Sequence, residues 1–112
     1  MQLKILKLIL DIQSVMLEIE SVKIKTNNNF NSFKSDILLQ RAVERDLEII
    51  GEAIRKIIEI DPNISISSAK LIIGLRNIIS HAYDSVEPEM IWGIIQNNIP
   101  ELAEEINKIK NA

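Results

Sequence analysis

The chain has 112 residues, a formal net charge of −3 at pH 7 and a hydrophobic content of 46%. It contains no cysteine and one histidine, which excludes a disulfide framework and a Cys/His zinc site within one copy. Its apolar content excludes a disordered chain, and its acidic balance argues against nonspecific coating of nucleic acid. We expect a single domain over residues 1–112 in a cytoplasmic protein that spans no membrane, because no apolar run approaches the roughly 18 residues of a spanning helix.

Apolar residues recur at intervals of three and four along the chain, which predicts helices rather than strands. In chain order the predicted helices cover residues 2–25, 36–60, 67–82, 88–98 and 100–110, with an asparagine-rich loop at 26–32. Ser35 or Asp36, and Ser67, are candidate N-caps. Pro88 is expected to start one segment and Pro100 another, since proline is tolerated in the first turn of a helix.

Two long antiparallel helices followed by two shorter ones predict an all-α fold, an antiparallel up-and-down four-helix bundle with a short fifth helix. The sequence contains 24 isoleucines but only four aromatic residues. A chain so small and so aliphatic is expected to bury further surface against a second copy of itself. We therefore predict a homodimer.

A stripe of charged residues follows the second predicted long helix at intervals of four, three, four and three: Arg41, Arg45, Glu48, Glu52 and Arg55. One interpretation is a solvated face stabilised by ion pairs between successive turns. The other is the polar wall of a cleft or subunit interface, in which carboxylates hold arginines toward a phosphate. Gly51 lies inside this helix at a cost of about 1 kcal/mol relative to alanine, which suggests that another backbone approaches closely there.

The third predicted helix contains the single histidine and the single tyrosine, and four of its residues bear on chemistry: Arg76, Asn77, His81 and Tyr83. Histidine is the natural acid–base residue near neutral pH, and arginine binds phosphate bidentately. Asn77 could orient the imidazole or contact a phosphate oxygen, and Tyr83 offers a hydroxyl and a ring for base stacking. Together they suit metal-free cleavage of RNA by its own 2′-hydroxyl.

Two features bear on this hypothesis. On an unbroken helix, Arg76 and His81 diverge by about 140°. Either the helix unwinds near His81, or two chains share the site. A structural role must also be weighed, because a lone histidine near the carboxyl end of a helix interacts favourably with the helix dipole. The sequence has no Mg²⁺-type carboxylate cluster and no phosphate-binding glycine loop, so we expect neither metal nor cofactor.

The run Arg76-Asn77-Ile78-Ile79-Ser80-His81-Ala82-Tyr83 resembles the R-x4-H-x-Y motif of HepT-type HEPN proteins. Upstream, the block from Ala42 to Ala53, which ends in Ile-Gly-Glu-Ala, is similar to the second-helix signature of that family. The segments 86–92 and 99–102 extend the similarity, which therefore covers nearly the whole chain in order.

This resemblance implies an all-helical, HEPN-like homodimer whose motif lines a cleft between subunits. It also implies a ribonuclease toxin with RNA as its substrate, in which Arg76 and His81 are catalytic and Asn77 supports Arg76. Arg45, Glu48 and Glu52 match the second-helix block as supporting residues. The implied partner is an MntA-type nucleotidyltransferase antitoxin that silences the toxin by transferring AMP to Tyr83. The alternative from another functional class is a non-catalytic helical subunit that binds substrate for, or regulates, a nucleotidyltransferase.

Overall fold

The structure, a computed structural model, describes the backbone of residues 2–81 and 87–112 and the side chains of residues 2–79 and 87–112. All regular elements in these ranges are helical, which confirms the predicted all-α class. They are α1 (Leu3–Lys25), α2 (Phe30–Lys34), α3 (Ile37–Ile60), α4 (Ala69–His81), α5 (Pro88–Gly93), the π-helical η1 (Ile94–Asn98) and α6 (Ile99–Asn111).

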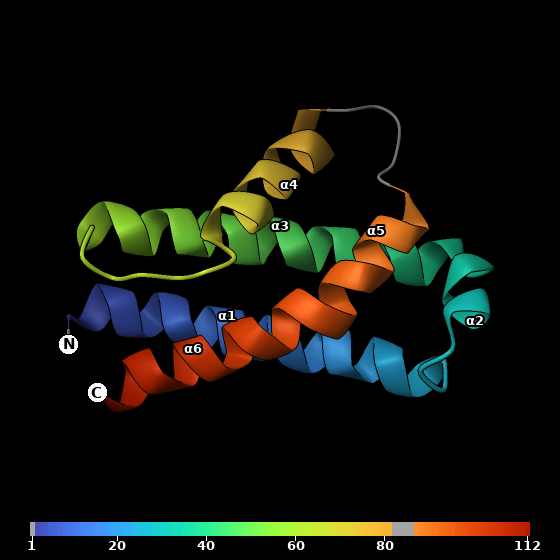
Figure 1. Cartoon of the computed structure of the whole chain (residues 1–112), viewed down its shortest axis with the longest axis horizontal. Helices are drawn as coiled ribbons and strands as arrows, with labels where there is room; N and C mark the ends of the chain where they lie inside the picture. Colours follow the sequence, from blue (N-terminus) through green and yellow to red (C-terminus); the bar gives the residue numbers. More distant parts are fainter. Residues whose placement is uncertain (1, 82–86) are drawn as a thin grey trace.

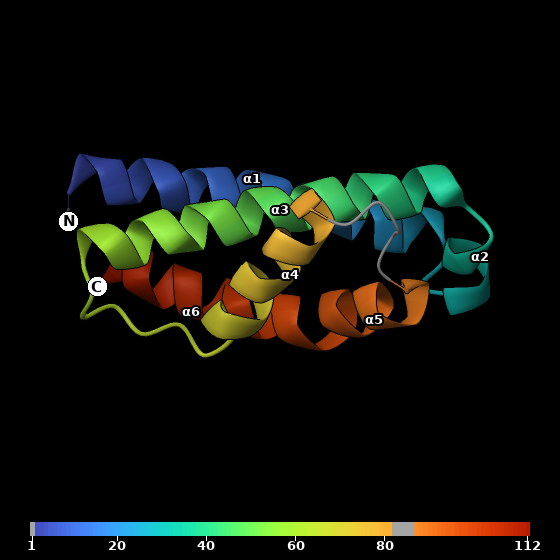
Figure 2. The same ribbon diagram turned by 90° about the horizontal axis from the view of Figure 1, so that it is seen from above.

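The two long helices α1 and α3 lie antiparallel and side by side (Figure 1). The segment α5–η1–α6 runs back along this pair, with α6 beside α1, and α4 packs on α3 at a steep inclination (Figure 2). Among the longer helices that the structure describes, α4 is the most steeply inclined to α1 and α3 (Figure 1). Its inclination brings the middle of α4 onto the middle of α3, where the charged stripe of the sequence lies.

The core between these helices is made mainly of isoleucine. Six isoleucines of α1 and α3 are fully buried: Ile9, Ile12, Ile19, Ile50, Ile54 and Ile57. Burying an isoleucine side chain contributes about 1.5–3 kcal/mol, so the aliphatic periodicity of the sequence accounts for the pairing of these helices. Among the helices that the structure describes, none is both long enough and apolar enough to cross a membrane.

The predicted loop at 26–32 is wrong at its carboxyl end, because α2 begins at Phe30. The side chain of Asn29 accepts a hydrogen bond from the backbone N–H of Ser32 and so caps this short helix. Phe33 is fully buried, with its ring centroid 5.1 Å from that of Trp92 on α5. A distant aromatic partner and a local cap therefore stabilise a helix that has too few residues to show periodicity.

Pro100 does not start a separate segment, since α5, η1 and α6 follow one another without a break. Pro100 has no N–H to donate to the carbonyl one α-turn earlier, and its ring would clash there. The chain widens into a π-helical turn before it, where the N–H of Ile99 bonds to the carbonyl of Ile94. The predicted fifth helix is thus the continuation of the fourth.

The three candidate N-caps differ in outcome, and Ser35 is the C-cap of α2 instead. Asp36 caps α3 by accepting a hydrogen bond from the N–H of Leu39, as predicted. Ser67 is not a cap, because α4 begins two residues later at Ala69. Its hydroxyl instead lies 2.6 Å from a carboxylate oxygen of Glu101 and 2.9 Å from one of Glu105, which ties the start of α4 to α6.

Candidate functional site

The site begins with the contact between α3 and α4 at Gly51. A Cβ added to Gly51 would lie 2.7 Å from Cβ of Arg76 and 3.0 Å from the carbonyl oxygen of Ile72. The close approach of another backbone, predicted from the cost of a glycine in mid-helix, is therefore confirmed. Its consequence is that Arg76 emerges from α4 directly above the turn of α3 that carries Glu52.

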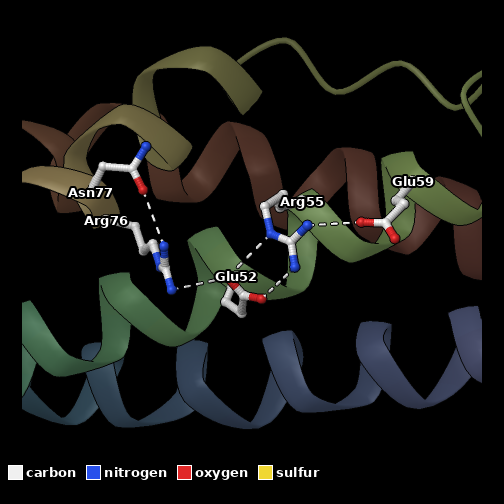
Figure 3. A network of polar contacts seen from close by, with 5 residues as sticks. All are labelled: Glu52, Arg55, Glu59, Arg76 and Asn77. Atoms are coloured by element: carbon white, nitrogen blue, oxygen red, sulfur yellow. Dashed lines mark hydrogen bonds and ion pairs between the residues drawn. The ribbon is translucent and has the colours of Figure 1, made fainter. Parts of the chain in front are cut away.

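The guanidinium of Arg76 is held by two acceptors (Figure 3). Nη2 lies 3.2 Å from Oε2 of Glu52, and Nη1 donates to Oδ1 of Asn77 at 3.1 Å. Both Arg76 and Glu52 are about one-third exposed, at 31% and 29% of the side chain. The arginine is thus oriented by the protein but remains open to a ligand.

Glu52 joins two arginines, because it also accepts hydrogen bonds from Nε and Nη2 of Arg55, at 3.3 and 2.7 Å. The hydrogen bond from Arg55 lowers the pKa of Glu52, and the positive charges of Arg55, Arg76 and Lys56 act in the same direction. Glu52 is therefore a carboxylate at neutral pH. Arg55 in turn donates to Glu59 at 2.8 Å, which completes the network of Figure 3.

A pocket of about 240 Å³, here called the Arg76 pocket, opens between α1, α3 and α4. Its charged lining residues are Asp11, Arg45, Glu48, Glu52, Lys56 and Arg76. The apolar side chains of Leu8, Ile49 and Ala53 also line it. Four of the residues predicted for the site, Arg45, Glu48, Glu52 and Arg76, are thus brought together.

The two ends of the charged stripe behave differently from its middle. Arg41 forms an ion pair with Glu44 at 2.7 Å and does not line the pocket. Arg55 pairs with Glu52 and Glu59. Ion pairs between successive turns therefore account for the ends of the stripe, as the first interpretation expects, while its middle forms a pocket wall, as the second expects.

The side chains of two predicted site residues, His81 and Tyr83, are not among those that the structure describes. The backbone of His81 closes α4, so the helix continues to that residue, but its side chain is outside the described side chains. Tyr83 lies outside the described residues, and of the alternative that the helix unwinds near His81 the structure describes only the part up to His81 itself, where α4 is still helical.

The pocket lining has three cations and three acids, so its charge as a whole does not select an anion. The group in it that suits a phosphate is the guanidinium of Arg76, which Glu52 and Asn77 orient and which remains partly exposed. Within residues 2–79 and 87–112, no cluster of three or more potential ligands that could hold a metal ion is found. A family model described as Ribonuclease HepT-like matches residues 5–109. The chain belongs to this HepT-like family.

The HepT-like chain is similar to several curated proteins. It is 35% identical over 82 residues to "Putative RNase MJ1380" of Methanocaldococcus jannaschii, covering 70% of this chain and 72% of that protein. It is 38% identical over 82 residues to "Putative RNase TTE0752" of Caldanaerobacter subterraneus subsp. tengcongensis, with 72% and 73% covered. A third relative, "Putative RNase MJ0125" of M. jannaschii, is 32% identical over 103 residues, with 88% and 84% covered. No significant match to a solved structure was found.

Sequence reasoning missed five lining residues of this HepT-like pocket: Leu8, Asp11, Ile49, Ala53 and Lys56. Lys56 lies one turn after Glu52, so extending the stripe along its flank would have found it. Leu8 and Asp11 belong to α1, and no spacing within α1 signals which face of α3 they will meet. Their placement is a product of tertiary packing.

Proposed function

We propose that this chain is a metal-independent endoribonuclease, the toxin of a type VII-like HEPN/nucleotidyltransferase toxin–antitoxin pair. The observation that carries the proposal is the orientation of Arg76 by Glu52 and Asn77 at the rim of a half-open pocket. This arginine lies on the same helix as the single histidine. Membership of the HepT-like family supports RNA as the substrate.

In the proposed step the RNA 2′-hydroxyl attacks the adjacent phosphorus while the bond from phosphorus to the 5′-oxygen breaks. The products are a 2′,3′-cyclic phosphate and a 5′-hydroxyl end. His81 accepts the proton of the 2′-hydroxyl or returns a proton to the leaving 5′-oxygen. Arg76 stabilises the negative charge that develops on the non-bridging phosphate oxygens. Every proton is transferred between RNA and imidazole, so the step requires no metal.

The proposed active form is a homodimer of HEPN-like four-helix bundles. Arg76 and His81 point about 140° apart on a regular helix, and α4 continues to His81. A cleft between two copies can combine the arginine of one chain with the histidine of the other. By symmetry the dimer would form two such sites, each with the arginine of one chain and the histidine of the other.

Silencing is proposed to occur at Tyr83, through an adjacent MntA-type nucleotidyltransferase. The tyrosine oxygen attacks the α-phosphorus of ATP, pyrophosphate leaves, and the phenol proton is released. The resulting phosphodiester adds an anion seven residues after Arg76 in the sequence. It would pair with that guanidinium and occupy the RNA pocket.

The test is incubation of purified protein with RNA in the presence of EDTA, followed by analysis of the product ends. Cyclic phosphates are expected, and His81→Ala should lower the cleavage rate by about 10²–10⁴-fold. Arg76→Ala should lower it by about 10²–10³-fold. Lys25→Gln, an exposed change at the far end of α1, is the matched control. A folded wild-type protein that leaves RNA intact would instead favour the non-catalytic, nucleotidyltransferase-binding alternative.

Tyr83→Phe separates silencing from cleavage. The variant should retain ribonuclease activity and remain active after incubation with ATP and the cognate nucleotidyltransferase, because the acceptor oxygen is absent. Mass spectrometry of the wild-type protein should show the addition of AMP to Tyr83. Complete inhibition of the Phe variant by the same treatment would refute this mechanism of silencing.

A further inference from the structure

A second pocket adjoins the Arg76 pocket between the start of α1 and the end of α3. It has a volume of about 390 Å³ and is lined by four cations, Lys4, Lys7, Arg55 and Lys56, and by one acid, Glu59. Leu8 and Ile60 line it as well. The beginning of α1 and the end of α3 lie side by side in both views (Figures 1 and 2). We call this surface the lysine groove.

The charge of the lysine groove is opposite to that of the chain. The whole sequence has a net charge of −3, whereas the groove has four cations and one acid. Within the part of the chain that the structure describes, the side chains of Lys4 and Lys56 form no hydrogen bond and no ion pair, whereas Lys7 pairs with Asp11 and Arg55 pairs with Glu52 and Glu59. Lys4 and Lys56 are therefore the cations of the groove whose charge is not already matched by a carboxylate within 4 Å. The first turn of α1 contains no acidic residue, so the positive end of the helix dipole reinforces the field of Lys4. A local positive potential of this kind attracts a polyanion.

The lysine groove is continuous with the Arg76 pocket, since Leu8 and Lys56 line both. Along α3 the joined surface extends from Arg45 to Ile60, which at a rise of about 1.5 Å per residue is about 22 Å of helix. A ligand held at Arg76 and longer than the pocket must leave it at an end. At the end of the Arg76 pocket near Lys56, the surface continues into the lysine groove, where Lys4, Lys7 and Arg55 lie.

The geometry points to the lysine groove as a binding track for the RNA strand on one side of the bond that is cleaved, with Lys4, Lys7 and Lys56 contacting its phosphates. The inference rests on the proposed function, because it extends the same substrate away from Arg76. Lysine suits this task because it binds phosphate as a point charge and carries no base specificity. The groove therefore selects substrate length rather than sequence.

Binding is tested with a 2′-O-methyl RNA 12-mer, which lacks the attacking hydroxyl, by fluorescence anisotropy over a range of salt concentrations. Lys4→Gln/Lys7→Gln should weaken binding roughly tenfold at low salt and lower the slope of log affinity against log salt by about 1.4, or 0.7 per lost phosphate contact. The matched control is Lys25→Gln/Lys34→Gln, which removes the same charge from the last turn of α1 and from α2, and like Lys7 in the groove variant, Lys34 has a carboxylate partner, Glu89. This control should retain the wild-type slope.

Cleavage is measured on a dinucleotide and on an unmodified 12-mer. The ratio of kcat/KM for the 12-mer to that for the dinucleotide should fall about tenfold in Lys4→Gln/Lys7→Gln and remain unchanged in the control. Wild-type affinity and salt slope in the double variant would overturn the lysine groove. Displacement of the RNA by poly-glutamate of equal charge would also overturn it, because the lysine groove would then bind an acidic polypeptide rather than RNA. A wild-type protein that binds through the groove yet cleaves neither substrate would refute the ribonuclease proposal alone.

Discussion

The position of Arg76 is decided by two consecutive residues of α3. Gly51 lets the Cβ of Arg76 settle against the helix, and Glu52 holds its guanidinium. The sequence predicted close contact at Gly51, because glycine costs stability inside a helix. It did not indicate which element makes the contact, since that depends on the inclination of α4.

Gly51→Ala should destabilise the protein by about 1–3 kcal/mol, because the new methyl group would overlap Arg76 and the carbonyl of Ile72. Gly74→Ala is the matched control, since a Cβ there meets nothing within 4 Å. This control should gain up to about 1 kcal/mol from helix propensity. Urea denaturation of both variants is the measurement, and equal effects would contradict the steric role of Gly51.

Glu52→Gln should reduce RNA cleavage about tenfold with little loss of stability, because a neutral amide holds two arginines less firmly than a carboxylate. Glu20→Gln is the control, since Glu20 forms an ion pair with Lys23 on α1 and lines neither the Arg76 pocket nor the lysine groove. Single-turnover cleavage rates and thermal denaturation should be compared. A Glu52→Gln variant that cleaves as fast as wild type would show that Arg76 needs no carboxylate to be positioned.

Asp46 is a buried acid between α1 and α3, with 4% of the residue exposed. Burial raises its pKa to about 7, the charge of Glu18 on α1 acts in the same direction, and Arg45 opposes them. The unfolded chain releases this proton near pH 4, while the folded chain retains it until about pH 7. The stability that Asp46 contributes is therefore complete below pH 4 and is lost as the pH rises to 7.

Asp46→Asn should remove this loss and stabilise the protein at pH 8 by about 1–3 kcal/mol relative to wild type. At pH 5, where the folded wild type is already protonated at Asp46, the gain should be smaller. Free energies of unfolding measured in urea at both pH values check the prediction. A gain that does not depend on pH would show that Asp46 is ionised in the folded protein.

At the scale of the elements, periodicity predicted α1 and α3 to within one or two residues, because each buries one continuous aliphatic face. It failed at α2, whose five residues are stabilised by the Asn29 cap and by an aromatic contact with α5. It also divided α5–η1–α6 at Pro100, because a proline signals a helix start unless the chain widens into a π-turn before it. Neither cause is visible in local spacing.

Phe33→Ala should destabilise the protein by about 3–5 kcal/mol, because its side chain is fully buried against Trp92. The fluorescence of Trp92, the single tryptophan, should shift toward the red as water reaches its ring. Phe30→Ala is the comparison, since Phe30 is only partly buried and its ring lies farther from Trp92, at 6.1 Å. Equal losses in the two variants would contradict the anchoring role of Phe33.

At the scale of the whole molecule, the sequence identified half of the pocket wall. Arg45, Glu48 and Glu52 follow from one helical stripe, and Arg76 from its motif. That these residues share a pocket, and that Asp11 and Lys56 join them, depends on how three helices pack. Long-range packing of this kind leaves no signature in the spacing within any one helix.

The proposed sharing of the site between two chains predicts complementation. Arg76→Ala and His81→Ala should each be inactive, but a refolded equimolar mixture should recover roughly a quarter of wild-type activity. Half of the dimers are then mixed, and each mixed dimer has one intact site of two. RNA cleavage by the mixture is the measurement. If the mixture stays inactive although subunit exchange is demonstrated, Arg76 and His81 act within one chain.

The contact at Gly51 has a consequence for the evolution of the family. The Cβ of any residue other than glycine at position 51 would collide with the Cβ of Arg76 and the carbonyl oxygen of Ile72. A substitution at position 51 therefore requires a change in how α4 packs on α3. A relative with a side chain at this position must tilt or shift α4, and the arginine that corresponds to Arg76 would then need a different acceptor in place of Glu52. Substitutions at positions 51, 52 and 76 should therefore be correlated among HepT-like chains.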